Sequence, residues 1–302
     1  MKEKAINFVK NFKRSPAVAI GVALKKINID IFPYIDAKLK DSTKLLGFDP
    51  NTAGPDVLTR FVSAISENSH AVNCKEIYSV EGFLNHAEIQ PFVSKAAAQR
   101  LGELFTSSGS DKSSTHDYHL VYQPILQSLS EQYQAFYVAE IGIGSNNLTT
   151  QFNMGFWGVP GASLRAFRDF SQKINVYGAD IDSTILFSED RISTQQVDQF
   201  IPEMINSFLL PTHEKPCLVI DDGMHALRAN MNVFIAFIDG IKTSNKKLSD
   251  RWLVIEDIGL SADMASFWVE VVSNLPMFFQ GWVVHTKNSN IVVIKYCCNY
   301  AC

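Results

Sequence analysis

The segment Asp221-Asp222-Gly223-Met224-His225 holds the side chains best suited to chemistry. Two carboxylates follow an apolar run, a glycine permits a turn, and a histidine opens the next helical pattern. Glu256-Asp257 follows a later apolar run in the same way. Clustered carboxylate oxygens suit Mg²⁺ or Mn²⁺, and a histidine can accept a proton near neutral pH. The alternative is that the two aspartates cap the following helix and His225 only packs.

A glycine turn, Glu140-Ile-Gly-Ile-Gly144, follows another apolar run. Glycines there let the backbone turn tightly and approach a ligand closely. Asp180 ends the next apolar run, where a carboxylate can accept the hydroxyls of a ribose. Ser145 follows Gly144, so the third glycine of the nicotinamide fingerprint is missing. The pattern favours S-adenosylmethionine (SAM); a nicotinamide site and a plain turn are the alternatives.

Apolar runs alternate with helical patterns from about residue 106 onward. Strands that are apolar on both faces and alternate with helices predict a mostly parallel, doubly wound, Rossmann-like α/β sheet. Ligands of such sheets bind beyond the carboxyl ends of the strands, which is where the glycine turn and the acidic residues lie. The expected strands are 135–141, 174–179, 216–220 and 252–255, with a terminal antiparallel hairpin at 281–285 and 290–296, and the expected helices are 163–170, 224–241 and 262–275.

The first 105 residues read as helices broken by turns and show no catalytic pattern. The sequence therefore divides into a helical region, 1–105, and a catalytic domain, 106–302, joined by a loop at 107–110. The apolar run 15–24 follows basic residues and is expected to be an ordinary helix; a helix on a membrane surface is the alternative. We expect the helical region to support oligomerisation or to shape the acceptor pocket.

Composition narrows the classes of partner. The chain of 302 residues is 46% apolar and 19% charged, as in an ordinary globular protein, and its net charge of −4 gives no nucleic-acid footprint. Its five cysteines are irregularly spaced without a CxxC pair, which suits a reducing cytoplasm. No run is long enough to cross a bilayer.

Six stretches together resemble the macrolide sugar O-methyltransferase and cephalosporin hydroxylase-like family of class I SAM-dependent methyltransferases. The resemblance does not reach the first 105 residues. The matching stretches are 110–122, which begins Ser110-Asp-Lys, together with 140–144, 160–169, 177–182, 220–225 and 255–257.

The resemblance implies O-methylation of a sugar hydroxyl in a glycan or glycosylated metabolite. It implies that Asp222 and Asp257 bind Mg²⁺ or Mn²⁺ and that His225 acts as the general base, with Asp222 beside it. It also implies that the segment around Lys112 and His116 folds over SAM. Together with the glycine turn, this gives an expected cofactor set of Lys112, His116, Tyr118, Glu140, Gly142, Gly144, Ser145, Ser163, Asp180, Asp198 and Asp221.

One residue departs from the family pattern. Gln123 stands where members often carry a Glu that joins the metal site, and an amide oxygen is a weaker ligand than a carboxylate. Two alternatives therefore remain open: a nicotinamide-dependent oxidoreductase or hydroxylase-like relative, and a non-catalytic module that binds SAM or a glycan. The long connection 145–160 carries Phe152, Phe156 and Trp157, which would stack on a ligand or pack against a second subunit of a homo-oligomer.

Overall fold

The computed structural model describes residues 77–147, 153–154, 158–213, 215–242, 249–259, 262–273, 275 and 278–296. The expectations for residues 1–76 lie outside these ranges, as do those for Phe152, Phe156 and Trp157. Of the five cysteines, Cys217 lies within them, and it is buried with a free thiol.

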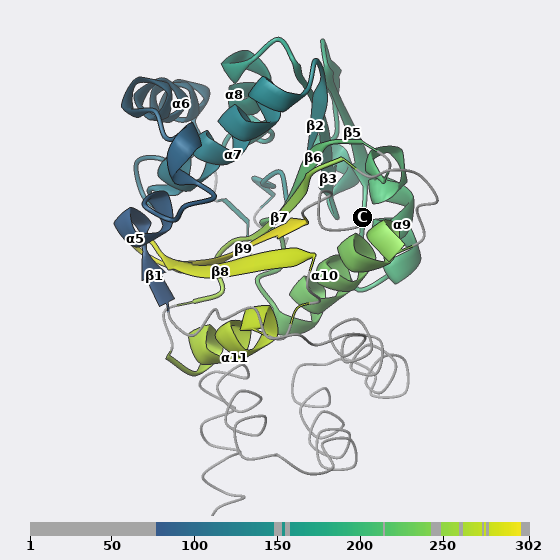
Figure 1. The fold of residues 1–302 in the computed structure, drawn as a ribbon. Helices are drawn as coiled ribbons and strands as arrows, with labels where there is room; N and C mark the ends of the chain where they lie inside the picture. Colours follow the sequence, from purple (N-terminus) through teal and green to yellow (C-terminus); the bar gives the residue numbers. More distant parts are fainter. Residues whose placement is uncertain are drawn as a thin grey trace, which may run out of the picture.

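The described strands form one nine-stranded sheet in the order β1-β8-β9-β7-β6-β2-β3-β5-β4 (Figure 1). Neighbouring strands are parallel except for β9, which is antiparallel to β7 and β8, and β4, which is antiparallel to β5. The sheet is therefore mostly parallel and ends in an antiparallel hairpin, as the sequence predicts. The strands are β1 (Ile77–Ser79), β2 (Phe136–Ile141), β3 (Ile174–Asp180), β4 (Ser188–Glu189), β5 (Ile192–Gln196), β6 (Cys217–Asp221), β7 (Arg251–Ile255), β8 (Phe279–His285) and β9 (Asn290–Tyr296).

Helices cover both faces of the sheet (Figure 1). One apolar core joins the sheet to α9, α10 and α11, with Phe234 and Trp268 at its centre. A second core on the opposite face joins the sheet to α5, α6, α7 and α8 through residues such as Phe105 and Phe167. The helices are α5 (Val80–Leu84), α6 (Lys95–Ser108), α7 (Tyr118–Gln132), α8 (Ala162–Phe170), α9 (Pro202–Leu209), α10 (Leu227–Lys242) and α11 (Ala262–Ser273), with 3₁₀ turns at Gln90–Phe92, Ser183–Ile185 and Leu210–Thr212.

The strand order reverses direction beside β2. From β2 the chain passes to β3 and β5 on one side, and then returns to place β6 and β7 on the other side. The carboxyl ends of these parallel strands share one edge of the sheet. A reversal of this kind opens a crevice at that edge, where α/β proteins bind their ligands.

The segment before residue 106 is continuous with the rest of the fold. The helix α6 begins after Ser94, whose Oγ accepts a hydrogen bond from the backbone N–H of Ala97, and ends at Gly109 in the left-handed region (φ 89°). The expected boundary at residue 105 and the start of the expected loop at 107–110 thus fall inside this helix. The helix packs against α7 and α8, and β1 pairs with β8, so residues 77–108 belong to the layers of the α/β fold.

Gln123 fastens α7 to the segment before α6. Its side chain is buried; Oε1 accepts from the backbone N–H of Ser94 at 2.9 Å, and Nε2 donates to the carbonyl of Phe92 at 3.0 Å. The amide is therefore directed at backbone groups and not at the acidic residues of the strand ends. Gln123, which stands where members of the similar family often carry a metal-binding Glu, has a structural role in this chain.

We predict that replacing Gln123 with Met lowers the free energy of unfolding by about 1–3 kcal/mol, because it leaves two backbone groups without partners. Gln127 on the same helix makes only an exposed bond to Glu131, so Gln127→Met should change stability by less than about 0.5 kcal/mol. Urea unfolding of both variants measures the difference, and equal effects would contradict the anchoring role.

Candidate functional site

Acidic side chains gather at the ends of four neighbouring strands. Glu140 is the second-last residue of β2, and Asp180 and Asp221 are the last residues of β3 and β6. Glu256 follows β7 directly. The backbone N–H of Asp222 donates to Ile141 at 2.9 Å and that of Glu256 donates to Asp221 at 2.9 Å, so the hydrogen bonding of the sheet continues past the strands. The parallel topology thus brings these side chains to one edge, as the sequence predicts.

The glycine turn after β2 fits closely against the turn after β6. Gly142 has φ 92°, and a Cβ there would lie 2.1 Å from the carbonyl oxygen of Asp222. The carboxylate of Asp180 holds the turn from the other side, since it accepts the backbone N–H of Ile143 at 3.0 Å and that of Asp182 at 3.0 Å. The turn therefore needs glycine for both its conformation and its close backbone approach.

A cavity of about 570 Å³, counting space open to solvent, lies above this turn. Five residues of the expected cofactor set line it: Gly142, Gly144, Ser145, Asp180 and Asp198. Residues outside the expected cofactor set complete the lining, namely Ile141, Ile181, Val197, Gln199, Phe200, Asp222, Gly223 and Met224.

Two polar residues of the cavity wall are held by short hydrogen bonds. Ser145 Oγ donates to Asp182 Oδ2 at 2.6 Å, and Asp198 Oδ1 accepts the backbone N–H of Phe200 at 2.8 Å. The second bond turns the chain so that Phe200 follows Asp198 along the wall. The wall thus offers a carboxylate beside an aromatic ring, which together suit a base with an exocyclic amino group.

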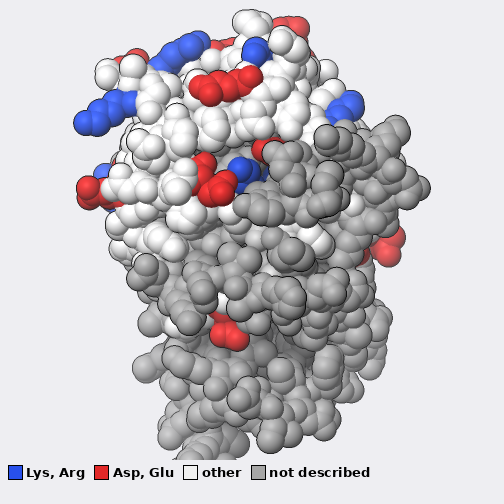
Figure 2. Space-filling view, viewed as in Figure 1, with Lys and Arg blue, Asp and Glu red and all other residues white. Residues whose placement is uncertain are grey.

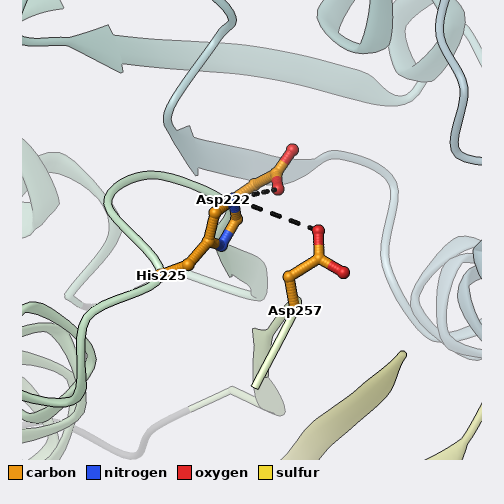
Figure 3. Close-up of side chains that lie close together, drawn as sticks. All are labelled: Asp222, His225 and Asp257. Atoms are coloured by element: carbon orange, nitrogen blue, oxygen red, sulfur yellow. Dashed lines mark ion pairs between the residues drawn. The ribbon is translucent and has the colours of Figure 1, made fainter. Parts of the chain in front are cut away.

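The residues expected to hold a metal and a proton lie together (Figure 3). His225 Nε2 is 3.9 Å from Asp222 Oδ1 and 4.0 Å from Asp257 Oδ2, and all three side chains are about one-quarter exposed. One ligand atom from each lies within 4.8 Å of the others. This metal-site triad combines two carboxylates, whose oxygens suit Mg²⁺ or Mn²⁺, with an imidazole nitrogen that can accept a proton.

Two members of the metal-site triad have strained backbones. His225 and Asp257 both have φ 50°, in the left-handed region that residues with a Cβ rarely adopt. Such a conformation costs about 1–2 kcal/mol per residue and persists only where the surroundings impose it. Their side chains are thus fixed in direction by the turns after β6 and β7.

Asp257 is surrounded by residues that were expected at the cofactor. The hydroxyl of Tyr118 donates to Asp257 Oδ1 at 2.6 Å, and the ring of His116 stacks on Tyr118 with Nδ1 3.7 Å from the same oxygen. Burial favours a raised pKa for the Asp257 carboxyl, but the hydrogen bond from Tyr118 and the nearby His225 and His116 hold its pKa below the ordinary value. Neither His116 nor Tyr118 lines the cavity, so the structure places both beside the metal-site triad instead.

Lys112, a member of the expected cofactor set, contacts acidic side chains of the protein. Its side chain is 3% exposed, and its Nζ lies 2.6 Å from Asp222 Oδ2, 2.7 Å from Glu256 Oε2 and 3.1 Å from Glu140 Oε1. The resemblance implies that the segment around Lys112 folds over SAM, and in the structure the ammonium contacts three carboxylates of the protein. Burial alone would lower the pKa of Lys112, and these carboxylates raise it well above its ordinary value.

Further contacts fix the carboxylates around Lys112. Ser163 Oγ donates to Glu140 Oε2 at 2.6 Å, and the hydroxyl of Tyr122 donates to Glu256 Oε1. Burial raises the pKa of both Glu140 and Glu256. Glu140 and Ser163 were expected to contact the cofactor; they are buried below the cavity and support Lys112.

Asp221, also in the expected cofactor set, does not line the cavity. It is fully buried, and its two oxygens accept from Gln199 Nε2 at 2.6 Å and Asn230 Nδ2 at 2.8 Å. Gln199 Oε1 in turn accepts the backbone N–H of Met224 at 2.7 Å. Asp221 therefore anchors the turn that carries Asp222 and His225, and it does not reach the cavity.

The segment 111–117 is held over the strand ends by the turn between β8 and β9. Lys287 Nζ donates to the carbonyl of Ser114 at 3.0 Å, and Asn288 Nδ2 donates to that of Thr115 at 2.6 Å. No pattern in the sequence predicts these contacts. They explain how a surface segment can deliver Lys112 into the buried cluster.

The described part of the surface in Figure 2 does not indicate a particular class of macromolecular partner. Figure 2 shows acidic and basic side chains interspersed over the described part of one face. Within the described ranges, none of the helices combines the length and apolar character that a membrane span requires.

Comparison with known proteins finds solved structures only. No protein-family model and no curated protein matches the chain. Among solved structures, the MycE methyltransferase of the mycinamycin biosynthetic pathway, crystallised with Mg and SAH, is 28% identical with a TM-score of 0.40; the match covers 52% of this chain and 39% of MycE. A further MycE structure with Mg, SAH and mycinamycin VI is 27% identical over 52% of this chain and 36% of that one, with a TM-score of 0.38.

A SAM-dependent methyltransferase from Anabaena variabilis is 10% identical, with a TM-score of 0.34, over 76% of this chain and all of its own length. The structures named here are all of methyltransferases. The matched part of the chain spans about two-fifths of the length of MycE.

We predict that Gly142→Ala lowers the free energy of unfolding by at least about 1 kcal/mol more than Gly259→Ala, because overpacking adds to the cost of the left-handed backbone. Both glycines have positive φ, but a Cβ at Gly259 meets nothing within 4 Å, which makes it a matched control. Chemical denaturation measures both variants. Equal losses would show that the turn can move away from Asp222.

Proposed function

We propose that this chain is a SAM-dependent methyltransferase that acts on a hydroxyl group of a sugar, in a glycan or a glycosylated metabolite. The observation that carries the proposal is the position of Asp222. It lines the cavity above the glycine turn, and it also belongs to the metal-site triad with His225 and Asp257. A cofactor pocket and a site for activating a hydroxyl thus share one residue.

The cavity residues fit SAM. Gly142 and Gly144 would lie under the amino-acid part of the cofactor, Asp180 would accept hydrogen bonds from the ribose, and Asp198 with Phe200 would hold the adenine. The carboxylate of Asp180 accepts backbone N–H groups from Ile143, Gly144 and Asp182, and its two oxygens have about four acceptor positions in all, which leaves one for a hydroxyl. SAM, when bound, supplies an electrophilic methyl group.

The metal-site triad fits a divalent ion and a general base. Asp222 and Asp257 would hold Mg²⁺ or Mn²⁺, which, when bound, lowers the pKa of a coordinated hydroxyl. His225 would hold the proton that leaves the acceptor oxygen, at Nε2, the atom that faces both carboxylates. The MycE structures contain Mg and SAH, the same kinds of ligand that we propose here.

The proposal predicts a product that is heavier by one methyl group when candidate glycosides are incubated with the purified chain, SAM and Mg²⁺. Mass spectrometry detects the product. EDTA should abolish its formation and added Mg²⁺ should restore it. Binding of SAM by calorimetry, with no product from any acceptor, would instead identify a binding module, and preference for NAD(H) over SAM would refute the proposal.

Replacing His225 with Ala should lower kcat by about 10²–10⁴-fold, the usual contribution of a general base, and leave the affinity for SAM nearly unchanged. His119→Ala is the matched control, since that ring packs against Gly102 on α6 and should retain activity. Steady-state kinetics and calorimetry on both variants make the comparison. Unchanged turnover in His225→Ala would end the assignment of this residue as the base.

A further inference from the structure

Two sets of acidic residues meet at Asp222. One is the metal-site triad, and the other is Glu140, Asp222 and Glu256, whose ligand atoms also lie within 4.8 Å of one another. Asp222 presents Oδ1 to His225 and Oδ2 to Lys112. A carboxylate that offers one oxygen to each of two neighbouring positions is the arrangement by which a bridging residue holds two cations.

The second set already contains a cation. Lys112 Nζ lies within 3.1 Å of an oxygen from each of its three carboxylates. Glu140 and Glu256 are almost wholly buried, and buried carboxylates require a positive partner. Lys112 meets that requirement with an ammonium carried by the chain itself.

The supporting bonds hold the second set to this geometry. Ser163 takes the other oxygen of Glu140, and Tyr122 donates to Glu256. The backbone of Lys112 is fixed as well, because its carbonyl accepts the N–H of Tyr118 at 2.8 Å. The ammonium is therefore held in one place by groups on both sides of it.

We propose that Lys112 is a positioning residue that takes the place of a second divalent ion. It leaves Asp222 only one oxygen for the metal-site triad and limits the centre to one ion. The inference rests on the proposed function for the existence of the first ion. The position among Glu140, Asp222 and Glu256 holds no divalent ion because the Lys112 ammonium occupies it.

The test counts Mn²⁺ ions bound to the full chain in the absence of SAM, by electron paramagnetic resonance of free Mn²⁺ and by calorimetry. The unaltered chain should bind one ion. Lys112→Met, which removes the ammonium and leaves three carboxylates, should bind two. Lys112→Arg keeps the charge and should bind one.

A further variant locates the added ion. Glu140→Gln in the Lys112→Met background removes a carboxylate that only the second set uses, so the count should return to one. If Lys112→Met does not fold, Lys112→Gln is measured in its place, because its amide still donates hydrogen bonds to the carboxylates.

The outcomes separate this inference from the proposed function. If the unaltered chain binds one ion and Lys112→Met, or Lys112→Gln in its place, also binds one ion with equal affinity, the inference is overturned. The proposed metal-assisted function is then unaffected. No ion in the unaltered chain and one in Lys112→Met would support the inference and refute the metal-site triad. No ion in either, or two in the unaltered chain, would overturn the inference.

Discussion

The site is organised around one ammonium among three carboxylates. Parallel strands bring their ends together, so acids at the ends of β2, β6 and β7 would repel one another in a buried space. Lys112 offsets that repulsion, but only if its segment is held down. The turn between β8 and β9 donates hydrogen bonds to the carbonyls of Ser114 and Thr115. The helix α7 follows this segment and is anchored by the side chain of Gln123. The turn between β8 and β9 and the helix α7 thus both help to position the Nζ atom of Lys112.

The sequence predicts which strand ends carry the site, because that information is local. Apolar runs mark the strands, and parallel pairing places Asp222, His225 and Asp257 at one edge. The sequence cannot assign partners within the edge, because successive side chains leave a strand in opposite directions. Asp221 thus faces Gln199 and Asn230 while Asp222 faces Lys112, although the two stand side by side.

The start of the fold was also hard to predict from local patterns. The strand β1 has three residues, too few for a periodic signal, and its pairing with β8 joins segments about two hundred residues apart. The helix α6 extends past residue 106, where the sequence changes from helical patterns to alternating strands and helices. Gly109, read as part of a loop, is the left-handed residue that ends this helix, a common role for glycine. Its position was the one available sign that the helix continued.

Asp222 couples the buried cluster to the proposed reaction. Its Oδ2 accepts a hydrogen bond from Lys112. The other carboxylate partners of Lys112 are held by the buried residues Ser163 and Tyr122, so these residues help to fix the direction of the Asp222 side chain. Strain acts in the same sense, because the left-handed backbones of His225 and Asp257 are imposed by the turns that carry them. Both features fix donor atoms before any ligand arrives, and preorganised charge of this kind favours catalysis because nothing has to reorient during the reaction. The sheet edge therefore supplies the rigidity that the proposed methyl transfer to a weakly nucleophilic hydroxyl would require.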